Sequence, residues 1–223
     1  MAAFRLAERM GVGEVELDVQ FSKDRKIVIC HDRILFRFGY PDLCVPELML
    51  DELLALDMGS WFSPHLYGGE RMLTLDALLS VFWNRFVYHI EIKSPEKELS
   101  EAVIDALRTH RLWDRAILTS FYFDVLDGVR ALAPELRVGW LLREGEWALP
   151  NIQRAAAAGF YQICPPAIEV EREVVVTAHR HVSEVRAHSV KGMTEIMKAI
   201  EAGCDGLTIN WPDWLIHEGT EKK

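Results

Sequence analysis

Residues 86–93 read Phe86-Val-Tyr-His-Ile-Glu-Ile-Lys93, an extended run in which apolar and polar side chains alternate. Because successive side chains of a β-strand point to opposite faces, Glu91 and Lys93 share one face while isoleucines occupy the other. A helical pattern over 96–109 follows almost directly. A strand that leads into a helix is the unit from which parallel α/β sheets are built.

The same alternation of strands and helices continues along most of the chain. We expect barrel-type strands at 14–19, 86–93, 115–119, 137–142, 160–164, 182–188 and 205–209, and helices at 2–10, 74–83, 96–109, 122–132, 150–158, 170–180 and 192–202. Polar residues suited to chemistry lie at the carboxyl ends of these strands, which is where (β/α)8 barrels place their active sites. The pattern therefore predicts an α/β fold of the TIM (β/α)8 barrel type, although the strand count is one short of closure.

One segment, residues 32–72, breaks this rhythm with several prolines and the Gly68-Gly69 pair. It follows an extended run at 27–31 and contains one acidic helical pattern near 51–56. We interpret 32–72 as a small insertion after the His31-Asp32 pair. The length of the chain suits one large domain, so we expect residues 1–223 to form a single barrel domain.

Composition excludes several classes of partner. The formal net charge of −9 argues against nucleic acid and against an electrostatic attachment to anionic lipid. No apolar run reaches the roughly 18 residues that a membrane span requires, and the first residues lack the apolar core of a signal peptide. The widely spaced cysteines are typical of reduced core thiols; they are Cys30, Cys44, Cys164 and Cys204. We therefore expect a cytoplasmic protein without nucleic-acid partners and without stable membrane insertion.

A second strand carries acids on one face. In Glu14-Val-Glu-Leu-Asp-Val19 the carboxylates occupy alternate positions, so Glu16 and Asp18 can reach one point above the strand end, and Glu91 can approach it from another strand. Converging carboxylates repel each other unless a cation lies between them. Solvent-facing acids are the alternative interpretation, but the repetition of the pattern on two strands favours a site for a divalent cation such as Mg²⁺ or Ca²⁺.

Two basic groups complete the candidate site. Lys93 is either a salt-bridge partner for Glu91 or a contact for an anionic substrate. His31 ends an apolar extended run and precedes Asp32; imidazole titrates near neutral pH, which suits proton transfer to a leaving alkoxide. His89 shares the face of Glu91 but is expected to be a hydrogen-bonded interior residue. The set indicates metal-assisted phosphoryl chemistry.

The order of these motifs resembles the glycerophosphodiester phosphodiesterase family. The resemblance spans about residues 3–214 and rests on Gly13-Glu-Val-Glu-Leu-Asp-Val19, Ser22-Lys-Asp24, Val28-Ile-Cys-His-Asp32, Glu91-Ile-Lys93, Gly59-Ser-Trp-Phe-Ser-Pro64, Arg71-Met-Leu-Thr-Leu75, Ser120-Phe121, Pro134-Glu-Leu-Arg-Val-Gly139 and Gly203-Cys-Asp-Gly-Leu-Thr-Ile-Asn-Trp-Pro212. It implies a (β/α)8 barrel that hydrolyses a small-molecule glycerophosphodiester to an alcohol and glycerol 3-phosphate in lipid and glycerol metabolism. It also implies a divalent cation held by Glu16, Asp18 and Glu91, with His31 as the general acid and Lys93 as the phosphate contact.

The chain departs from the family pattern at several places. The family's first strand ends in a His-Arg-Gly motif followed by Pro-Glu-Asn-Thr, and this sequence contains neither. The resemblance therefore implies a TIM (β/α)8 barrel that lacks its first strand, and we expect an N-terminally truncated chain with impaired activity. His188-Ser-Val-Lys191 replaces the usual Trp-Thr-Val-Asn, and Asn210 replaces the usual Asp.

Two other functions remain open at this level. One is a non-catalytic barrel that acts as a binding or regulatory domain, and the other is a related lipid phosphodiesterase with different pocket walls. The sequence leaves open the alcohol of the substrate, the choice of metal and the oligomeric state.

Overall fold

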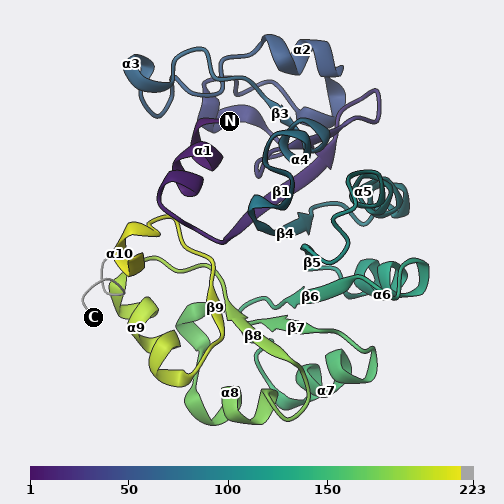
Figure 1. The fold of residues 1–223 in the computed structure, drawn as a ribbon, viewed down its shortest axis with the longest axis vertical. Helices are drawn as coiled ribbons and strands as arrows, with labels where there is room; N and C mark the ends of the chain where they lie inside the picture. Colours follow the sequence, from purple (N-terminus) through teal and green to yellow (C-terminus); the bar gives the residue numbers. More distant parts are fainter. Residues whose placement is uncertain (217–223) are drawn as a thin grey trace. The chain divides into compact units, whose positions relative to one another are not determined.

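The computed structural model describes residues 1–216, and its contacts divide the chain into two compact units, Met1–Ala116 and Ile117–Lys223. The first unit contains both strands that carry the candidate acids, together with the insertion (Figure 1). The second unit contains the remaining strand–helix repeats.

The sheet of the first unit is built around two parallel strands. β1 (Glu14–Phe21) pairs in parallel with β4 (Val87–Ile92). On the other side of β1, β2 (Ile27–Ile29) and β3 (Leu73–Thr74) pair in antiparallel fashion, which gives the order β3-β2-β1-β4. The extended run predicted at 27–31 is therefore the return arm of a hairpin and not a barrel-type strand.

Amphipathic helices follow these strands. α1 (Ala2–Arg9) precedes β1, while α4 (Leu75–Phe82) packs against β2 and against α5 (Lys97–His110). Thr74 begins α4 by accepting a hydrogen bond from the amide of Ala77, a standard way to satisfy a free helical N–H. α5 buries the apolar side chains Leu99, Val103, Ile104 and Leu107, whose spacing follows the helical period.

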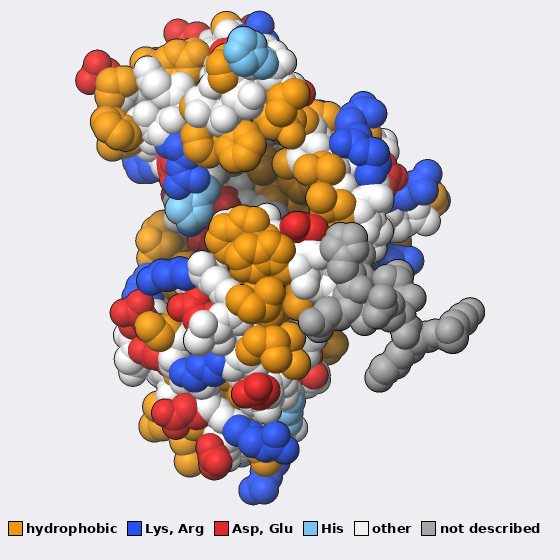
Figure 2. All heavy atoms as spheres, turned by 90° about the vertical axis from the view of Figure 1, so that its left-hand side faces the viewer, with side chains coloured by type: hydrophobic (Ala, Val, Ile, Leu, Met, Phe, Trp, Pro, Cys, Tyr) orange, Lys and Arg blue, Asp and Glu red, His pale blue; other side chains and the backbone are white. Residues whose placement is uncertain are grey.

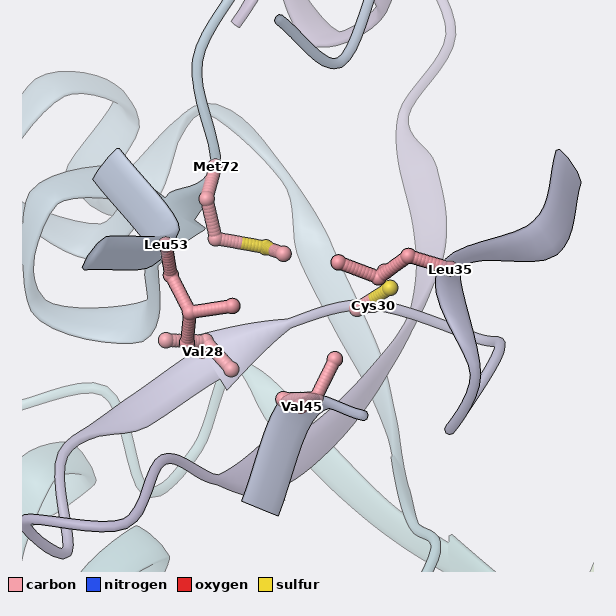
Figure 3. Packing of buried hydrophobic residues seen from close by; sticks show 6 residues of the cluster. All are labelled: Val28, Cys30, Leu35, Val45, Leu53 and Met72. Atoms are coloured by element: carbon pink, nitrogen blue, oxygen red, sulfur yellow. The ribbon is translucent and has the colours of Figure 1, made fainter. Parts of the chain in front are cut away.

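The insertion has a hydrophobic cluster of its own. It contains two short 3₁₀ helices, Leu35–Phe38 and Val45–Glu47, and two α-helices, α2 (Leu50–Ala55) and α3 (Pro64–Tyr67). Figure 3 shows the side chains that converge between these elements and β2, namely Val28, Cys30, Leu35, Val45, Leu53 and Met72. The predicted insertion and its acidic helix are confirmed, whereas α3 and the 3₁₀ turns were not anticipated.

Aromatic rings hold the outer loop of the insertion. Trp61 makes edge contacts with both Phe38 and Phe62, at centroid distances of 5.6 and 5.7 Å. The carboxylate of Asp57 accepts hydrogen bonds from three backbone amides of this loop, which lowers the pKa of Asp57. Several large hydrophobic side chains of the insertion still reach solvent, with Phe62 69 % exposed, and Figure 2 shows such side chains on the surface of the molecule.

The second unit continues the strand–helix repeat with parallel pairing throughout. Its strands are β5 (Ala116–Ser120), β6 (Arg137–Leu141), β7 (Gln162–Cys164), β8 (Glu184–Ala187) and β9 (Gly206–Leu207), in the order β5-β6-β7-β8-β9. The connecting helices are α6 (Phe123–Leu132), α7 (Leu149–Ala157), α8 (Arg172–Ala178) and α9 (Met193–Ala202), with a 3₁₀ turn at Ala167–Glu169 and a short α10 (Asp213–Ile216).

All seven predicted barrel-type strands are present within residues 1–216. The largest differences are two strands that are each three residues shorter than predicted: the strand predicted at 182–188 spans Glu184–Ala187, and the one predicted at 205–209 spans Gly206–Leu207. The carbonyl of Leu207 accepts a hydrogen bond from the guanidinium of Arg186, so side-chain contacts take over where the ladder ends. None of the helices in this described part has the length and apolar composition needed to cross a bilayer.

Candidate active site

The register of β1 against β4 brings the predicted acids together. Asp18 lies opposite Glu91, and Glu16 lies opposite His89. One carboxylate oxygen from each of Glu16, Asp18 and Glu91 lies within 4.8 Å of the other two. Glu91 is buried, and the other two acids are half-buried. The predicted convergence of these side chains is therefore what the structure shows.

A lysine compensates part of this negative charge. The ammonium of Lys93 lies 3.3 Å from Oδ1 of Asp18 and 3.1 Å from Oε1 of Glu91. Burial, together with the neighbouring charge of Asp18, raises the pKa of Glu91, while Lys93 acts in the opposite direction. Burial by itself would lower the pKa of Lys93, but the charges of Asp18 and Glu91 outweigh it and raise that pKa. The lysine thus stays protonated beside an excess of carboxylates.

The donor set of this cluster fits a hard divalent cation. Mg²⁺ and Ca²⁺ bind carboxylate oxygens at roughly 2.0–2.6 Å, so oxygens on one ion lie about 3–5 Å apart. The oxygens of Glu16, Asp18 and Glu91 meet that condition. The raised pKa of Glu91 also favours a cation at this place. A buried carboxylate beside another negative charge is unfavourable in its ionised form, and a nearby positive ion stabilises that form. These three residues could hold a metal.

His31 lies at the start of the insertion and is held by its neighbour. Its Nδ1 is 2.7 Å from Oδ1 of Asp32, whose other oxygen lies 3.1 Å from Nε of Arg37. The amide of the Gln20 side chain donates to the carbonyls of Cys30 and Asp32, which fixes the backbone on either side of the histidine. The His31 side chain is 62 % exposed. Since the carboxylate accepts at Nδ1, the atom left for proton transfer is Nε2.

A cavity of about 270 Å³ joins the histidine to the lysine. Its walls come from the end of β1, the following turn, the start of the insertion and the loop after β4; they are Gln20, Phe21, Ser22, Lys23, Arg25, His31, Arg33, Pro46, Lys93, Ser94 and Glu96. The three clustered carboxylates are not among these residues, so Lys93 is the link between the cavity and the acidic cluster. The basic residues Lys23 and Arg33 were not predicted as site residues.

Three further residues noted in the sequence, His89, His188 and Asn210, do not line this cavity. His89 is buried, and its Nε2 lies 3.0 Å from Oε2 of Glu14, as expected for an interior hydrogen-bonded residue. In the second unit His188 packs its ring edge-on against Phe121 and lies with Nε2 2.9 Å from the carbonyl of Leu142. Asn210 is exposed and follows the end of β9.

Comparison with known proteins identifies the family. Residues 1–214 match the model of the glycerophosphoryl diester phosphodiesterase family. The chain belongs to this family of phosphoric diester hydrolases. A glycerophosphodiester phosphodiesterase of Caldanaerobacter subterraneus is 29 % identical over 224 residues, which cover 97 % of this chain and 90 % of the relative. A Bacillus subtilis protein of the same name is 28 % identical over 238 residues, covering 97 % of this chain and 79 % of the relative.

Solved structures confirm the fold class. A phosphodiesterase of Oleispira antarctica in complex with the product sn-glycerol-3-phosphate matches with a TM-score of 0.86 at 24 % identity, covering 99 % of this chain and 90 % of that one. The glycerophosphodiester phosphodiesterase of Thermotoga maritima matches with a TM-score of 0.77 at 24 % identity, covering 97 % and 90 %. The predicted TIM-barrel class is thereby confirmed.

Proposed function

We propose that this protein hydrolyses glycerophosphodiesters to an alcohol and sn-glycerol 3-phosphate with the help of a divalent cation held by Glu16, Asp18 and Glu91. The observation that carries the proposal is the convergence of these carboxylates on neighbouring strands. Membership of the phosphodiesterase family and the product bound to the Oleispira antarctica structure support the same substrate class.

The side chains divide the work of the reaction between them. When bound, a divalent cation supplies a positive charge that polarises the phosphoryl group and stabilises the charge developing on it. Lys93, which contacts two of the proposed ligands, adds a fixed positive charge for a phosphate oxygen. His31 donates the proton from Nε2 to the alcohol oxygen as its bond to phosphorus breaks, and Asp32 stabilises the protonated ring.

The direct test is metal-dependent turnover by the purified chain. We expect hydrolysis of glycerophosphoinositol with Mg²⁺ or Ca²⁺, loss of turnover after treatment with EDTA, and recovery when the cation is restored. Release of glycerol 3-phosphate is followed with a coupled dehydrogenase. The same assay tests the predicted impairment of this chain when a relative is measured beside it.

Glu91→Gln tests the role of Glu91 as a metal ligand without changing the packing around it. The amide keeps the shape of the side chain but removes its charge, so turnover should fall at least about 100-fold, because a lost metal ligand costs more than a supporting contact. Calorimetric titration with the cation should show weaker binding, and Glu201→Gln, on an exposed position of α9, should change neither result. Cation binding without hydrolysis of any glycerophosphodiester would instead support the alternative of a non-catalytic binding domain.

A further inference from the structure

The cavity beside His31 carries an excess of positive charge. Its cationic side chains are Lys23, Arg25, Arg33 and Lys93, and its single carboxylate is Glu96. Arg25 is already neutralised, because it lies 2.5 Å from a carboxylate oxygen of Glu96 and 3.9 Å from one of Glu98. Within residues 1–216 no ion pair involves the side chain of Lys23 or that of Arg33. Glu96 also interacts electrostatically with Arg33, but it is directly paired with Arg25, so Lys23 and Arg33 are the two cations of the wall without a direct ion-pair partner in this part of the chain.

Backbone contacts hold the turn that carries Lys23. The amide of Lys23 donates to the carbonyl of Leu48 at 2.8 Å. Asp24 accepts hydrogen bonds from the Ser22 hydroxyl and from the amide of Leu50, at 2.7 and 2.9 Å. These contacts tie the turn after β1 to the insertion, so Lys23 stands at a defined place on the cavity wall.

The segment that carries Arg33 is also held by the insertion. The carbonyl of Arg33 accepts a hydrogen bond from the amide of Val45 at 2.9 Å. Arg33 follows His31 by two residues, and both side chains line the cavity. Lys23 and Arg33 therefore stand on separate segments of the chain, and the backbone of each segment is fixed by hydrogen bonds to the insertion.

The cavity does not suit a quaternary ammonium group. Such cations are recognised by the open faces of aromatic rings. Phe21 is the aromatic residue of the lining apart from His31, and the guanidinium of Arg25 covers its ring at 3.9 Å from the centroid. A choline group would therefore meet positive charges without a free aromatic face.

On this basis we infer that the cavity binds a phosphomonoester on the alcohol portion of the substrate, through Lys23 and Arg33. The inference rests on the proposed function, because it places the departing alcohol beside His31, which protonates it. A phosphomonoester carries almost two negative charges at neutral pH, which suits two cations that lack a direct ion-pair partner. The cavity, at about 270 Å³, falls below the roughly 300–1,000 Å³ of sites for drug-sized ligands, which suits a compact headgroup.

A matched pair of substrates tests this inference. Glycerophosphoinositol and glycerophosphoinositol 4-phosphate differ only in the additional phosphate, so the ratio of their kcat/KM values isolates its contribution. We expect the phosphorylated substrate to be preferred about 10-fold or more in low salt, with the preference reduced as ionic strength rises. Lys23→Gln and Arg33→Gln should each lower the ratio about 5-fold, which is the effect of losing one partly exposed charge contact. Lys26→Gln, an exposed lysine of the same turn outside the cavity lining, should leave the ratio unchanged.

Each other outcome has a defined meaning. Equal kcat/KM values for the two substrates would overturn the inference while leaving the proposed hydrolysis intact. An equal loss on both substrates in Lys23→Gln and Arg33→Gln would place these cations at the scissile phosphate and would also overturn it. If neither substrate is hydrolysed, the proposed function fails, and calorimetry then tests the cavity alone by measuring the binding of glycerophosphoinositol 4-phosphate. Weaker binding by Lys23→Gln and Arg33→Gln than by the wild-type chain would support the inferred phosphomonoester site, and unchanged binding would refute it.

Discussion

His31 uses one ring nitrogen for Asp32, at 2.7 Å, and is largely exposed at the edge of the cavity. If it is a general acid, its importance depends on the leaving group. His31→Gln should lower turnover of glycerophosphoinositol by roughly 10²–10⁴-fold, because an alkoxide needs a proton to depart. Turnover of bis(p-nitrophenyl) phosphate should fall less than about 10-fold, because p-nitrophenolate leaves without protonation.

The two substrates are compared in the same preparation with and without the substitution. His65→Gln, an exposed histidine of α3, is the matched control and should behave as the wild-type chain does. An equal loss on both substrates would show that His31 acts in binding or in the fold, and not as a proton donor.

The residues of the candidate site differed in how visible they were in the sequence. Glu16, Asp18, Glu91 and Lys93 could be predicted because a strand's period of two places alternate charged residues on one face. Lys23 and Arg33 could not, because each is a single basic residue in an irregular segment. Only the hydrogen bonds that fold the turn and the insertion bring these two residues to one cavity. The metal, substrate and proton-transfer roles of all these residues stay predictions.

At the scale of secondary-structure elements, the insertion depends on its small hydrophobic cluster. Leu53 of α2 is completely buried in this cluster, whereas the adjacent Leu54 is 37 % exposed. Leu53→Ala should lower the free energy of unfolding by about 2–4 kcal/mol through lost burial and the cavity left behind. Leu54→Ala removes the same atoms from a partly exposed position and should cost less than about 1 kcal/mol.

Urea denaturation of the two variants measures this difference directly. Helix propensity is changed equally in both, so the difference between them reports burial alone. Similar losses of stability in the two variants would contradict the packing of α2 that Figure 3 shows.

The regular elements were predictable to within a few residues because their signals are local. α5, for example, buries one stripe of its surface, and that stripe is visible in the sequence as an apolar period over 96–109. The short helices of the insertion have no such signal. α3 has four residues and begins at Ser63, whose hydroxyl accepts a hydrogen bond from the amide of Leu66, and the loop before it depends on the capping carboxylate of Asp57. Such contacts appear only once the chain has folded.

At the scale of the whole molecule, His188 makes stability depend on pH. Burial lowers the pKa of His188 below its usual value, although its contact with the carbonyl of Leu142 acts in the opposite direction. Below pH of about 6.5 the unfolded chain therefore binds a proton that the folded chain does not, so stability falls as the pH decreases through this range.

His188→Phe should make the free energy of unfolding less steeply dependent on pH between about 7.5 and 5.5, because phenylalanine retains the ring contact with Phe121 but cannot bind a proton. Denaturation curves at several pH values provide the measurement. His181→Phe replaces an exposed histidine and should keep the slope of the wild-type chain. An unchanged slope in His188→Phe would show that this ring does not govern the acid sensitivity.

The comparisons extend across nearly the whole chain and bear out the class of fold that strand–helix alternation predicts. The single domain expected over residues 1–223 and the cytoplasmic location remain predictions. The alternation of strands and helices identifies the βα repeat in the sequence. It does not reveal the division of the chain into two compact units, because that division depends on contacts between residues distant in sequence.

The separate cluster of the insertion has a practical consequence for protein engineering. Four of its buried side chains, Leu35, Val45, Leu53 and Met72, are supplied by the insertion itself, while the acidic cluster is supplied by β1 and β4. Exchanging residues 33–72 between relatives should therefore transfer these side chains together with Arg33 and Pro46 of the cavity lining, with little disturbance of the strands that carry Glu16, Asp18 and Glu91. Libraries restricted to that segment offer a route to altered headgroup selectivity while these carboxylates stay unchanged.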